Sequence, residues 1–180
     1  MKIAVYAPKD QAEARDPSVE DKNIALNAYR LLHEWSLVPG QKSGDVFCPE
    51  EFKSWVREVD RLSNETGHYD VAMVCFGSVL IHAPAADGLW VAPIIAEVMN
   101  EKERDSLRDG YATALFNSRG AHWVDPEGKP EKELAEKYRQ QADLLEASGF
   151  QRFSKTLMDV AADYERQAER HITRFGKRVL

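Results

Sequence analysis

The sequence contains only two cysteines in 180 residues, Cys48 and Cys75, and neither belongs to a CxxC pair. Two thiols are too few for the disulfide scaffold of small secreted domains, so a reducing compartment is expected. No run approaches the roughly 18 apolar residues that a membrane span needs, and Met1–Pro8 lacks the pattern of a signal peptide. From these absences we predict a cytoplasmic protein that does not enter membranes.

Motifs that carry chemistry are also missing. There is no GxGxxG or GxxxxGK[ST] phosphate loop, no GxSxG turn, no HExxH zinc motif and no aromatic-plus-basic signature of an RNA-binding sheet. His82 and His122 each stand near an aspartate in a turn, a spacing more typical of a satisfied loop histidine than of a metal ligand. The sequence therefore predicts no catalytic residue, no cofactor and no metal site.

The charge is moderately negative. Thirty acidic residues against 24 basic ones give a net charge of −6, which repels a phosphate backbone and argues against nucleic-acid binding. The last dozen residues differ, because there a single acid, Glu169, accompanies four cations, Arg170, Arg174, Lys177 and Arg178. Two interpretations stay open: the cations complement the dipole of a helix C-terminus, or they form a small anionic docking site.

What is present is the pattern of a helical globular domain. With 43% apolar and 30% charged residues, the chain is long enough to bury one core, and we predict a single domain over residues 1–180. Apolar residues at helical intervals predict helices from Ser18 to Trp35, from Pro49 to near Gly67, after Pro93 and around Tyr111. The charged stretch 101–109 predicts a solvated turn or helix face.

Residues 70–83 are apolar all round, and periodicity does not separate a buried helix from a strand followed by a helix. Length favours a buried helix capped by Asp70, ending before Pro84. Residues 1–17 predict a short N-terminal strand or an extended arm. If Ile3–Tyr6 and Val71–Phe76 were neighbouring parallel strands, the fold would instead be α/β.

Residues 129–176 give the clearest pattern. Pro130 opens a helix, Gly149 stands where a helix-ending glycine belongs, and from Phe150 apolar residues alternate threes and fours over nearly seven turns. Two long helices joined by so short a turn run antiparallel. The prediction is a mainly α bundle of six or seven helices, with a core of residues 18–128 and a C-terminal αα-hairpin.

The stretch Asn117–Trp123 combines an amide, a guanidinium, an imidazole and an indole between two helices. Arg119 could bind an anion bidentately beside Trp123 as an apolar wall, or it could be an internal clamp while Trp123 plugs the core. Asp87, in the turn that leads to Trp90, is the natural partner of Arg119 if the two loops meet. The candidate ligand-binding residues are His82, Asp87, Trp90, Asn117, Arg119, His122 and Trp123.

A second short motif, Cys75-Phe-Gly-Ser78, could suggest a nucleophile turn. No base is positioned beside it in the sequence, and cysteine is among the most buried residue types. We therefore expect a buried, inert thiol, with the Ser78 hydroxyl bonded to a carbonyl one turn earlier.

Short stretches spaced over residues 24–170 carry a resemblance: Ala25–Trp35, Pro39-Gly40, Phe52–Trp55, Gly77–Trp90, Phe116–Gly120, Leu134–Arg139 and Ala161–Glu165. Together they resemble an uncharacterised helical module found at the C-terminal ends of larger bacterial proteins, beside separate catalytic or DNA-binding domains. The resemblance implies an accessory or interaction role and brings no established chemistry with it.

These observations lead to two functional hypotheses. The first is a non-catalytic regulatory or protein–protein interaction module of a bacterial cytoplasmic system, with a protein partner and with self-association as a further option. The alternative is a small enzyme or ligand-binding protein whose pocket joins the Asp87–Trp90 turn to the Asn117–Trp123 loop. There Arg119 would hold an anionic group and His82 or His122 would act as acid or base.

Overall fold

The computed structural model describes residues 18–42, 46–86, 88–121 and 123–175. Over these ranges the chain forms seven α-helices and one 3-10 turn, and its only β-type pairs are the isolated bridges Gln41–Phe47 and Ala86–Leu89. The prediction of a mainly helical bundle with a C-terminal hairpin is therefore confirmed. The strand or arm predicted for residues 1–17 lies outside the described residues.

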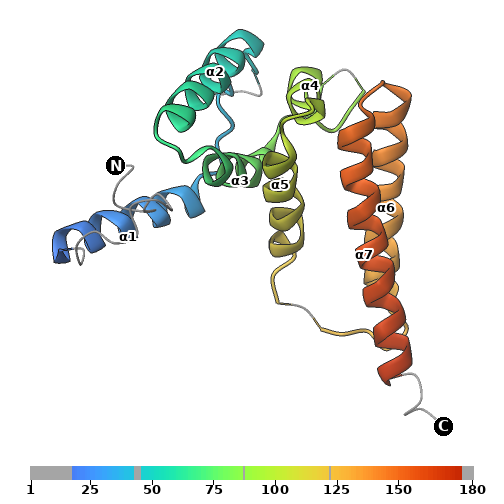
Figure 1. Ribbon diagram of the computed structural model, residues 1–180. Coiled ribbons are helices and arrows are strands. Elements are labelled where there is room, and N and C mark those ends of the chain that lie inside the picture. The colour runs from blue at the N-terminus through green and yellow to red at the C-terminus, as the bar shows by residue number, and fades with distance from the viewer. Residues whose placement is uncertain (1–17, 43–45, 87, 122, 176–180) are drawn as a thin grey trace.

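The elements form an arch (Figure 1). Helices α3 and α5 occupy its centre, α1 and α2 lie on one side, and the long pair α6 and α7 forms the other side, while α1 points away from the rest. Their bounds are α1 Val19–Glu34, α2 Pro49–Glu65, α3 Tyr69–Val79, the 3-10 turn Leu80–His82, α4 Pro93–Asn100, α5 Asp105–Ser118, α6 Lys129–Ala147 and α7 Gln151–Phe175.

Local sequence sets most of the helix ends. Prolines occupy the first positions of α2, α4 and α6, where a missing N–H costs nothing. Helix α6 ends at Ala147, and Gly149, two residues later, has a φ of 87°, in the left-handed region. There the Phe150 N–H donates to the Leu145 carbonyl at 2.8 Å and the Gly149 N–H to that of Glu146 at 2.9 Å, which together make a Schellman motif. This turn reverses the chain and produces the hairpin.

The ambiguous segment 70–83 is a helix followed by a 3-10 turn. Val71–Phe76 is helical, so the α/β alternative is wrong. The predicted cap is also wrong, because the helix begins at Tyr69 and Asp70 lies in its first turn. The Asp70 carboxylate accepts a hydrogen bond from the Ser106 hydroxyl at 3.0 Å instead, which joins α3 to the first turn of α5.

Helices α3 and α5 pack with their backbones in contact. A Cβ atom added at Gly77 would overlap the Leu107 carbonyl oxygen, and one added at Gly110 would overlap the carbonyl oxygen of Val74. Contacts advance together along both helices, from Asp70 with Ser106 to Val74 with Gly110, so the two helices run parallel. Glycine is required at both positions because any side chain would force the helices apart.

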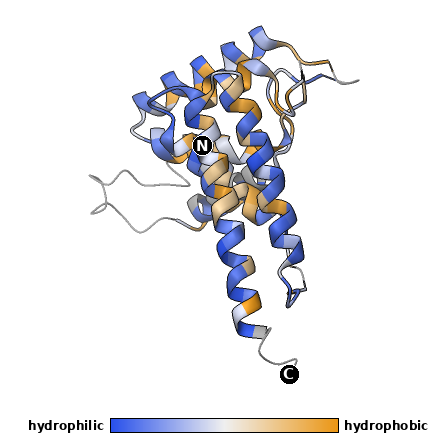
Figure 2. Cartoon of the chain, turned by 90° about the vertical axis from the view of Figure 1, so that its right-hand side faces the viewer, coloured by the Kyte–Doolittle hydropathy of each residue, from blue (hydrophilic) through white to orange (hydrophobic). Residues whose placement is uncertain are grey.

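Helices α6 and α7, the C-terminal hairpin, bury a large part of the hydrophobic core between them. The stripe of α7 is fully or almost fully buried, and it packs against a matching stripe of α6; these residues are Phe153, Leu157, Val160, Tyr164, Ala168, Ala135, Tyr138, Ala142 and Leu145. Figure 2 shows the same division, with hydrophilic residues over the outer turns and hydrophobic ones where the helices meet. The periodic stripe predicted for the hairpin is thus the one that is buried.

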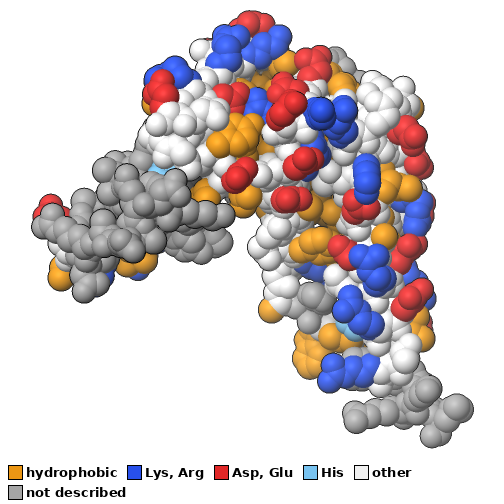
Figure 3. All heavy atoms as spheres, in the orientation of Figure 1, with side chains coloured by type: hydrophobic (Ala, Val, Ile, Leu, Met, Phe, Trp, Pro, Cys, Tyr) orange, Lys and Arg blue, Asp and Glu red, His pale blue; other side chains and the backbone are white. Residues whose placement is uncertain are grey.

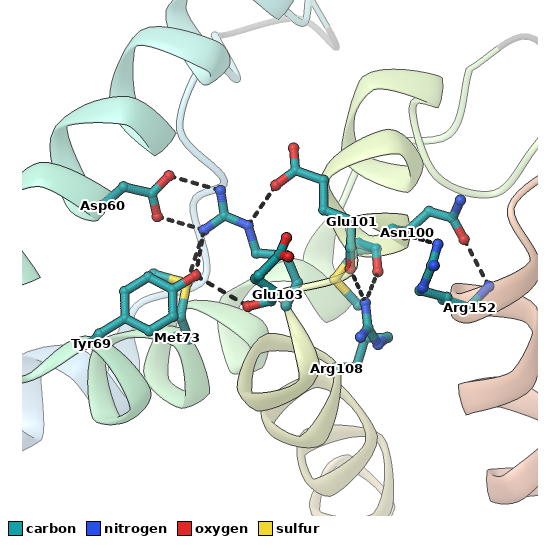
Figure 4. A network of polar contacts seen from close by, with 10 residues as sticks. Asp60, Tyr69, Met73, Asn100, Glu101, Glu103, Arg108 and Arg152 are labelled. Carbon is teal, nitrogen blue, oxygen red and sulfur yellow. Dashed lines mark hydrogen bonds and ion pairs between the residues drawn. The ribbon is translucent and has the colours of Figure 1, made fainter. Parts of the chain in front are cut away.

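The charged stretch 101–109 is solvated only in part: Glu101, Lys102, Glu103, Asp105 and Asp109 are exposed as predicted, but its two arginines are not. Arg104 and Arg108 are only 6% and 5% exposed. The Arg104 guanidinium donates to both carboxylate oxygens of Asp60 in α2, at 2.5 and 2.7 Å, and to Glu101 at 2.8 Å (Figure 4). Burial opposes the charge of Arg104, but the hydrogen bonds to Asp60 and Glu101 raise its pKa overall.

The same stretch also fixes α4 and α7. Arg108 donates to the main-chain carbonyls of Met99 and Glu101, at 2.6 and 2.7 Å, and so satisfies acceptors at the C-terminal end of α4. The Asn100 side chain accepts a hydrogen bond from the Arg152 N–H at 2.7 Å and caps the first turn of α7 (Figure 4). Residues 100–108 therefore form a polar junction that ties α2, α4, α5 and α7 together.

We predict that Gly110→Ala destabilises the protein by about 2 kcal/mol or more, because the new methyl group has to displace the backbone of α3. The sign of the change in unfolding free energy is informative, because alanine at an open helix position stabilises a protein by about 1 kcal/mol relative to glycine. Thr113→Ala, an exposed change one turn along the same helix, is the control and should leave the urea midpoint nearly unchanged. Equal midpoints for the two variants would contradict backbone contact.

We also predict that Arg104→Met lowers the free energy of unfolding by about 2 kcal/mol, because the partly buried Asp60 then loses its bidentate partner. Arg61→Met is the matched control: Arg61 likewise binds two carboxylates, Glu58 and Glu65, but on an exposed face of α2. Chemical denaturation of both variants makes the comparison, and a loss of similar size in the control would argue against the junction.

Candidate functional site

A buried ion pair closes the loop between α5 and α6. Arg119 follows the last turn of α5, and its Nη2 donates to Oε1 of Glu131 at 2.6 Å. Glu131 lies in the first turn of α6 and is fully buried. The side chains of two residues that are twelve positions apart in the sequence therefore meet, and this ion pair spans the loop between α5 and α6.

Both ends of this loop are held against α7. The Arg119 guanidinium lies 5.9 Å from the centre of the Tyr164 ring, and Nδ1 of His171 lies 3.6 Å from Oε2 of Glu131. Gly128, with a φ of 63°, packs so closely on α7 that an added Cβ would stand 2.9 Å from the Ala168 Cα. The loop is thus anchored over the two turns of α7 from Tyr164 to His171.

Electrostatics keep the Glu131 carboxylate charged in this setting. Burial disfavours the charge, but the hydrogen bond from Arg119, a backbone hydrogen bond and the Arg119 charge outweigh it and lower the pKa of Glu131 below its ordinary value of 4.5. Because the Arg119 side chain is only 14% exposed and forms an ion pair with Glu131, it acts as an internal clamp. Its expected partner Asp87 lies outside the described residues.

The clamp presents Trp123 to solvent. The Trp123 side chain is 96% exposed, and the adjacent Val124 is 41% exposed. The expectation that Trp123 plugs the core is therefore wrong. Figure 3 shows apolar side chains at the foot of the molecule beside the Lys and Arg side chains of the α7 end. A large aromatic group held outside the core by an anchored loop is the most unusual surface feature of the described chain.

The remaining candidate residues do not join this loop in one pocket. Trp90 packs on Phe153 at the start of α7, with ring centres 6.3 Å apart, whereas Arg119 contacts Tyr164. Eleven residues of helix separate those two contacts, a distance of about 16 Å. The structure therefore does not bring the turn of Trp90 and the loop of Trp123 together. His122 lies outside the described residues.

His82 and Asn117 do share a surface hollow between α3 and α5, lined also by Trp35, Cys75 and Ser78. Burial raises the pKa of the Cys75 thiol, which keeps it protonated and unreactive. The Ser78 hydroxyl donates to the Cys75 carbonyl at 2.6 Å, as expected from the sequence. Among the described residues that line it, the hollow holds no activated nucleophile.

The described residues contain no group of three or more His, Cys, Asp or Glu side chains placed to hold a metal ion. None of their helices has the length and apolar character needed to cross a bilayer.

Comparisons with protein-family models, with curated proteins and with solved structures find no match to this chain.

We predict that Arg119→Met destabilises the protein by about 3 kcal/mol near neutral pH, because the buried Glu131 carboxylate loses its charged donor. The loss should depend on pH. Glu131 has a lowered pKa in the folded state, so its pairing stabilises the fold above pH 4.5 and is lost as the pH falls through the folded-state pKa. The gap in unfolding free energy between wild type and variant should therefore shrink in acid.

The control for this series is Arg139→Met. Arg139 also bridges α6 and α7, through Glu165, but in an exposed position. Urea titrations of the three proteins across the acid range give the comparison. A gap for Arg119→Met that stays constant with pH, or an equal loss in Arg139→Met, would contradict the clamp.

Proposed function

We propose that this chain is a non-catalytic protein–protein interaction module and that Trp123, on its clamped loop, is the centre of the contact surface. The observation that carries the proposal is the 96% exposure of Trp123 on a loop closed by Arg119 and Glu131. Nothing in the fold itself requires an indole at this position, since the core is complete without it.

The free energy of burying an exposed tryptophan favours a role for Trp123 in binding. A tryptophan buries on the order of 200 Å² of surface when it is covered, and tryptophan is enriched among the residues that dominate binding energy at interfaces. A partner that covers Trp123 and Val124 therefore gains a large apolar contact. Because both loop ends are already anchored on α7, binding orders little additional backbone, which reduces the entropic cost of association.

The resemblance of residues 24–170 to a helical module at the ends of larger bacterial proteins supports the same role. We therefore extend the proposal to a regulatory or accessory function in a bacterial cytoplasmic system. The competing proposal of a small enzyme or ligand binder has less support, because the two loops that would form its pocket contact α7 about 16 Å apart.

The proposal is tested by placing a photoreactive phenylalanine analogue at position 123 of the full chain and irradiating it in a native lysate. Position 144 serves as the control, because Leu144 is an exposed apolar residue, 49% accessible, on α6. We expect a crosslinked product specific to position 123. Excess unlabelled wild type should abolish it by competing for the partner, and excess Trp123→Ala should not.

Trp123→Ala should retain the thermal stability of the wild type, because the side chain it removes makes little contact with the core. Equal products at positions 123 and 144, or competition by Trp123→Ala as effective as that by wild type, would contradict the proposed contact surface.

A further inference from the structure

The surface hollow between α3 and α5, at the centre of the arch (Figure 1), has the size of a small-molecule site. Its volume is about 500 Å³, and ligand pockets typically measure roughly 300–1,000 Å³. The described residues that line it include apolar side chains, short polar ones and one indole, that of Trp35, but no Lys, Arg, Asp or Glu. In that part of the lining, a ligand meets apolar surface and hydrogen-bonding groups, and no side chain with a fixed charge.

The close packing of α3 on α5 explains why the hollow exists. Gly110 and Ala114, one turn apart on α5, contribute almost no side chain to the lining, and α3 contributes the short side chains of Cys75 and Ser78. At Gly110 the two backbones are in contact. Because that contact leaves the helices little freedom to move, the hollow is preformed, which reduces the entropic cost of filling it.

The indole of Trp35 is held in place by other parts of the chain. Its Nε1 donates to the main-chain carbonyl of Leu37 at 2.7 Å, and its ring meets that of Trp55 edge to face, with ring centres 5.4 Å apart. Because the N–H is already used, Trp35 offers a ligand its ring and no donor. Among aromatic side chains, tryptophan binds cations best through its ring.

The hydroxyl groups of two serines in the hollow are acceptors. The Ser78 hydroxyl donates to the Cys75 carbonyl at 2.6 Å, and the Ser118 hydroxyl donates to the Leu115 carbonyl at 2.8 Å. A hydroxyl has a single proton, so each serine oxygen has only lone pairs left for a ligand. Asn117, next to Ser118, also lines the hollow and adds an amide oxygen as a further acceptor. These groups suit a ligand that donates hydrogen bonds.

Two helix C-termini lie at one end of the hollow, because α3 and α5 run parallel. The 3-10 turn that continues α3 ends at His82, α5 ends at Ser118, and both residues line the hollow. The C-terminus of a helix carries a partial negative charge of about half an elementary charge. The cation that follows in the sequence, Arg119, is engaged by the buried Glu131. This end of the hollow therefore favours a positively charged group.

We propose that the hollow binds a small organic cation with an apolar body, of the arylalkylammonium class. Its ammonium group donates to the Ser118 hydroxyl and the Asn117 amide oxygen at the helix ends. Its apolar body lies against the Trp35 ring and covers Val74, which is 42% exposed. An anion would lie against two helix C-termini, and an uncharged ligand would gain the apolar contact alone. The site does not involve Trp123 and is additional to the proposed protein contact.

The experiment titrates the full chain at pH 8 with three probes of similar size: phenethylammonium, uncharged 2-phenylethanol and anionic phenylacetate. Methyl ¹H–¹³C spectra report on Val74, Ile81 and Ala114, which line the hollow, and on Leu144, an exposed residue of α6. Phenethylammonium should shift the three signals of the hollow saturably and leave that of Leu144 unchanged. We expect 2-phenylethanol to bind roughly ten-fold more weakly. Phenylacetate should cause no shift at the same concentrations.

Two pairs of variants test the position of the site. Ser118→Lys places a cation at the helix ends and should weaken phenethylammonium binding by about ten-fold or more. Ser148→Lys is its control, because the Ser148 hydroxyl also donates to a main-chain carbonyl at 2.8 Å, at the exposed end of α6. Ala114→Leu fills the hollow and should abolish binding, whereas Ala147→Leu, at the exposed last residue of α6, should not. Thermal melting checks that each variant folds, and the Ser118→Lys pair suffices if Ala114→Leu does not.

The inference is overturned if the three probes shift the methyl signals at similar concentrations, because the hollow would then select for apolar surface alone. It is also overturned if phenylacetate binds most tightly, if no probe shifts the signals up to about 20 mM, or if Ser118→Lys and Ser148→Lys bind phenethylammonium alike. The photocrosslink at position 123 is a separate measurement, so either proposal can fail while the other stands.

Discussion

The contact of α3 with α5 through Gly77 and Gly110 is the constraint on which the arrangement of this protein depends. Two helices whose backbones touch have little freedom to slide or rotate, since any shift brings a neighbouring side chain into the gap. Helix α5 is thereby fixed in the middle of the arch, so both of its ends have defined positions to which other helices attach. The start of α5 carries two buried arginines, Arg104 and Arg108, and its other end carries the largely buried Arg119; both ends attach other helices.

The arginines at the two ends of α5 contact different helices. At the start of α5, Arg104 and Arg108 satisfy a carboxylate of α2 and the carbonyls of α4, and neighbouring Asn100 caps α7. At the other end, Arg119 binds Glu131 and holds the loop to α7. Buried ion pairs contribute little net stability compared with apolar packing, but they tolerate few alternative partners. We infer that they fix which helix ends meet, while the apolar stripes supply the stabilisation.

The sequence predicted what local pattern controls and missed what distant pairing controls. The hairpin followed from Gly149 and a regular stripe, both of which act within a few residues. Burial of Arg104 did not follow, because its partner Asp60 is 44 positions away and a charged run in isolation is typical of a solvated face. The sequence offered Arg119 as a possible internal clamp, which the structure confirms. Its partner Glu131 was missed because it resembles an ordinary acid in the first turn of a helix. The exposure of Trp123 was missed because tryptophan is usually buried.

The Arg119–Glu131 pair also links the stability of the fold to the order of the loop that carries Trp123. The loop that carries Trp123 contains a turn in which the Asp125 carboxylate accepts hydrogen bonds from the N–H groups of Glu127 and Lys129. Its ends are held by the Arg119–Glu131 pair and by the packing of Gly128 on α7. If the pair opened, the ends would separate and the loop would gain conformational freedom that a partner would have to remove on binding. In the proposed interaction module the pair therefore does more than connect α5 to α6, because it also restrains the loop that carries the exposed indole.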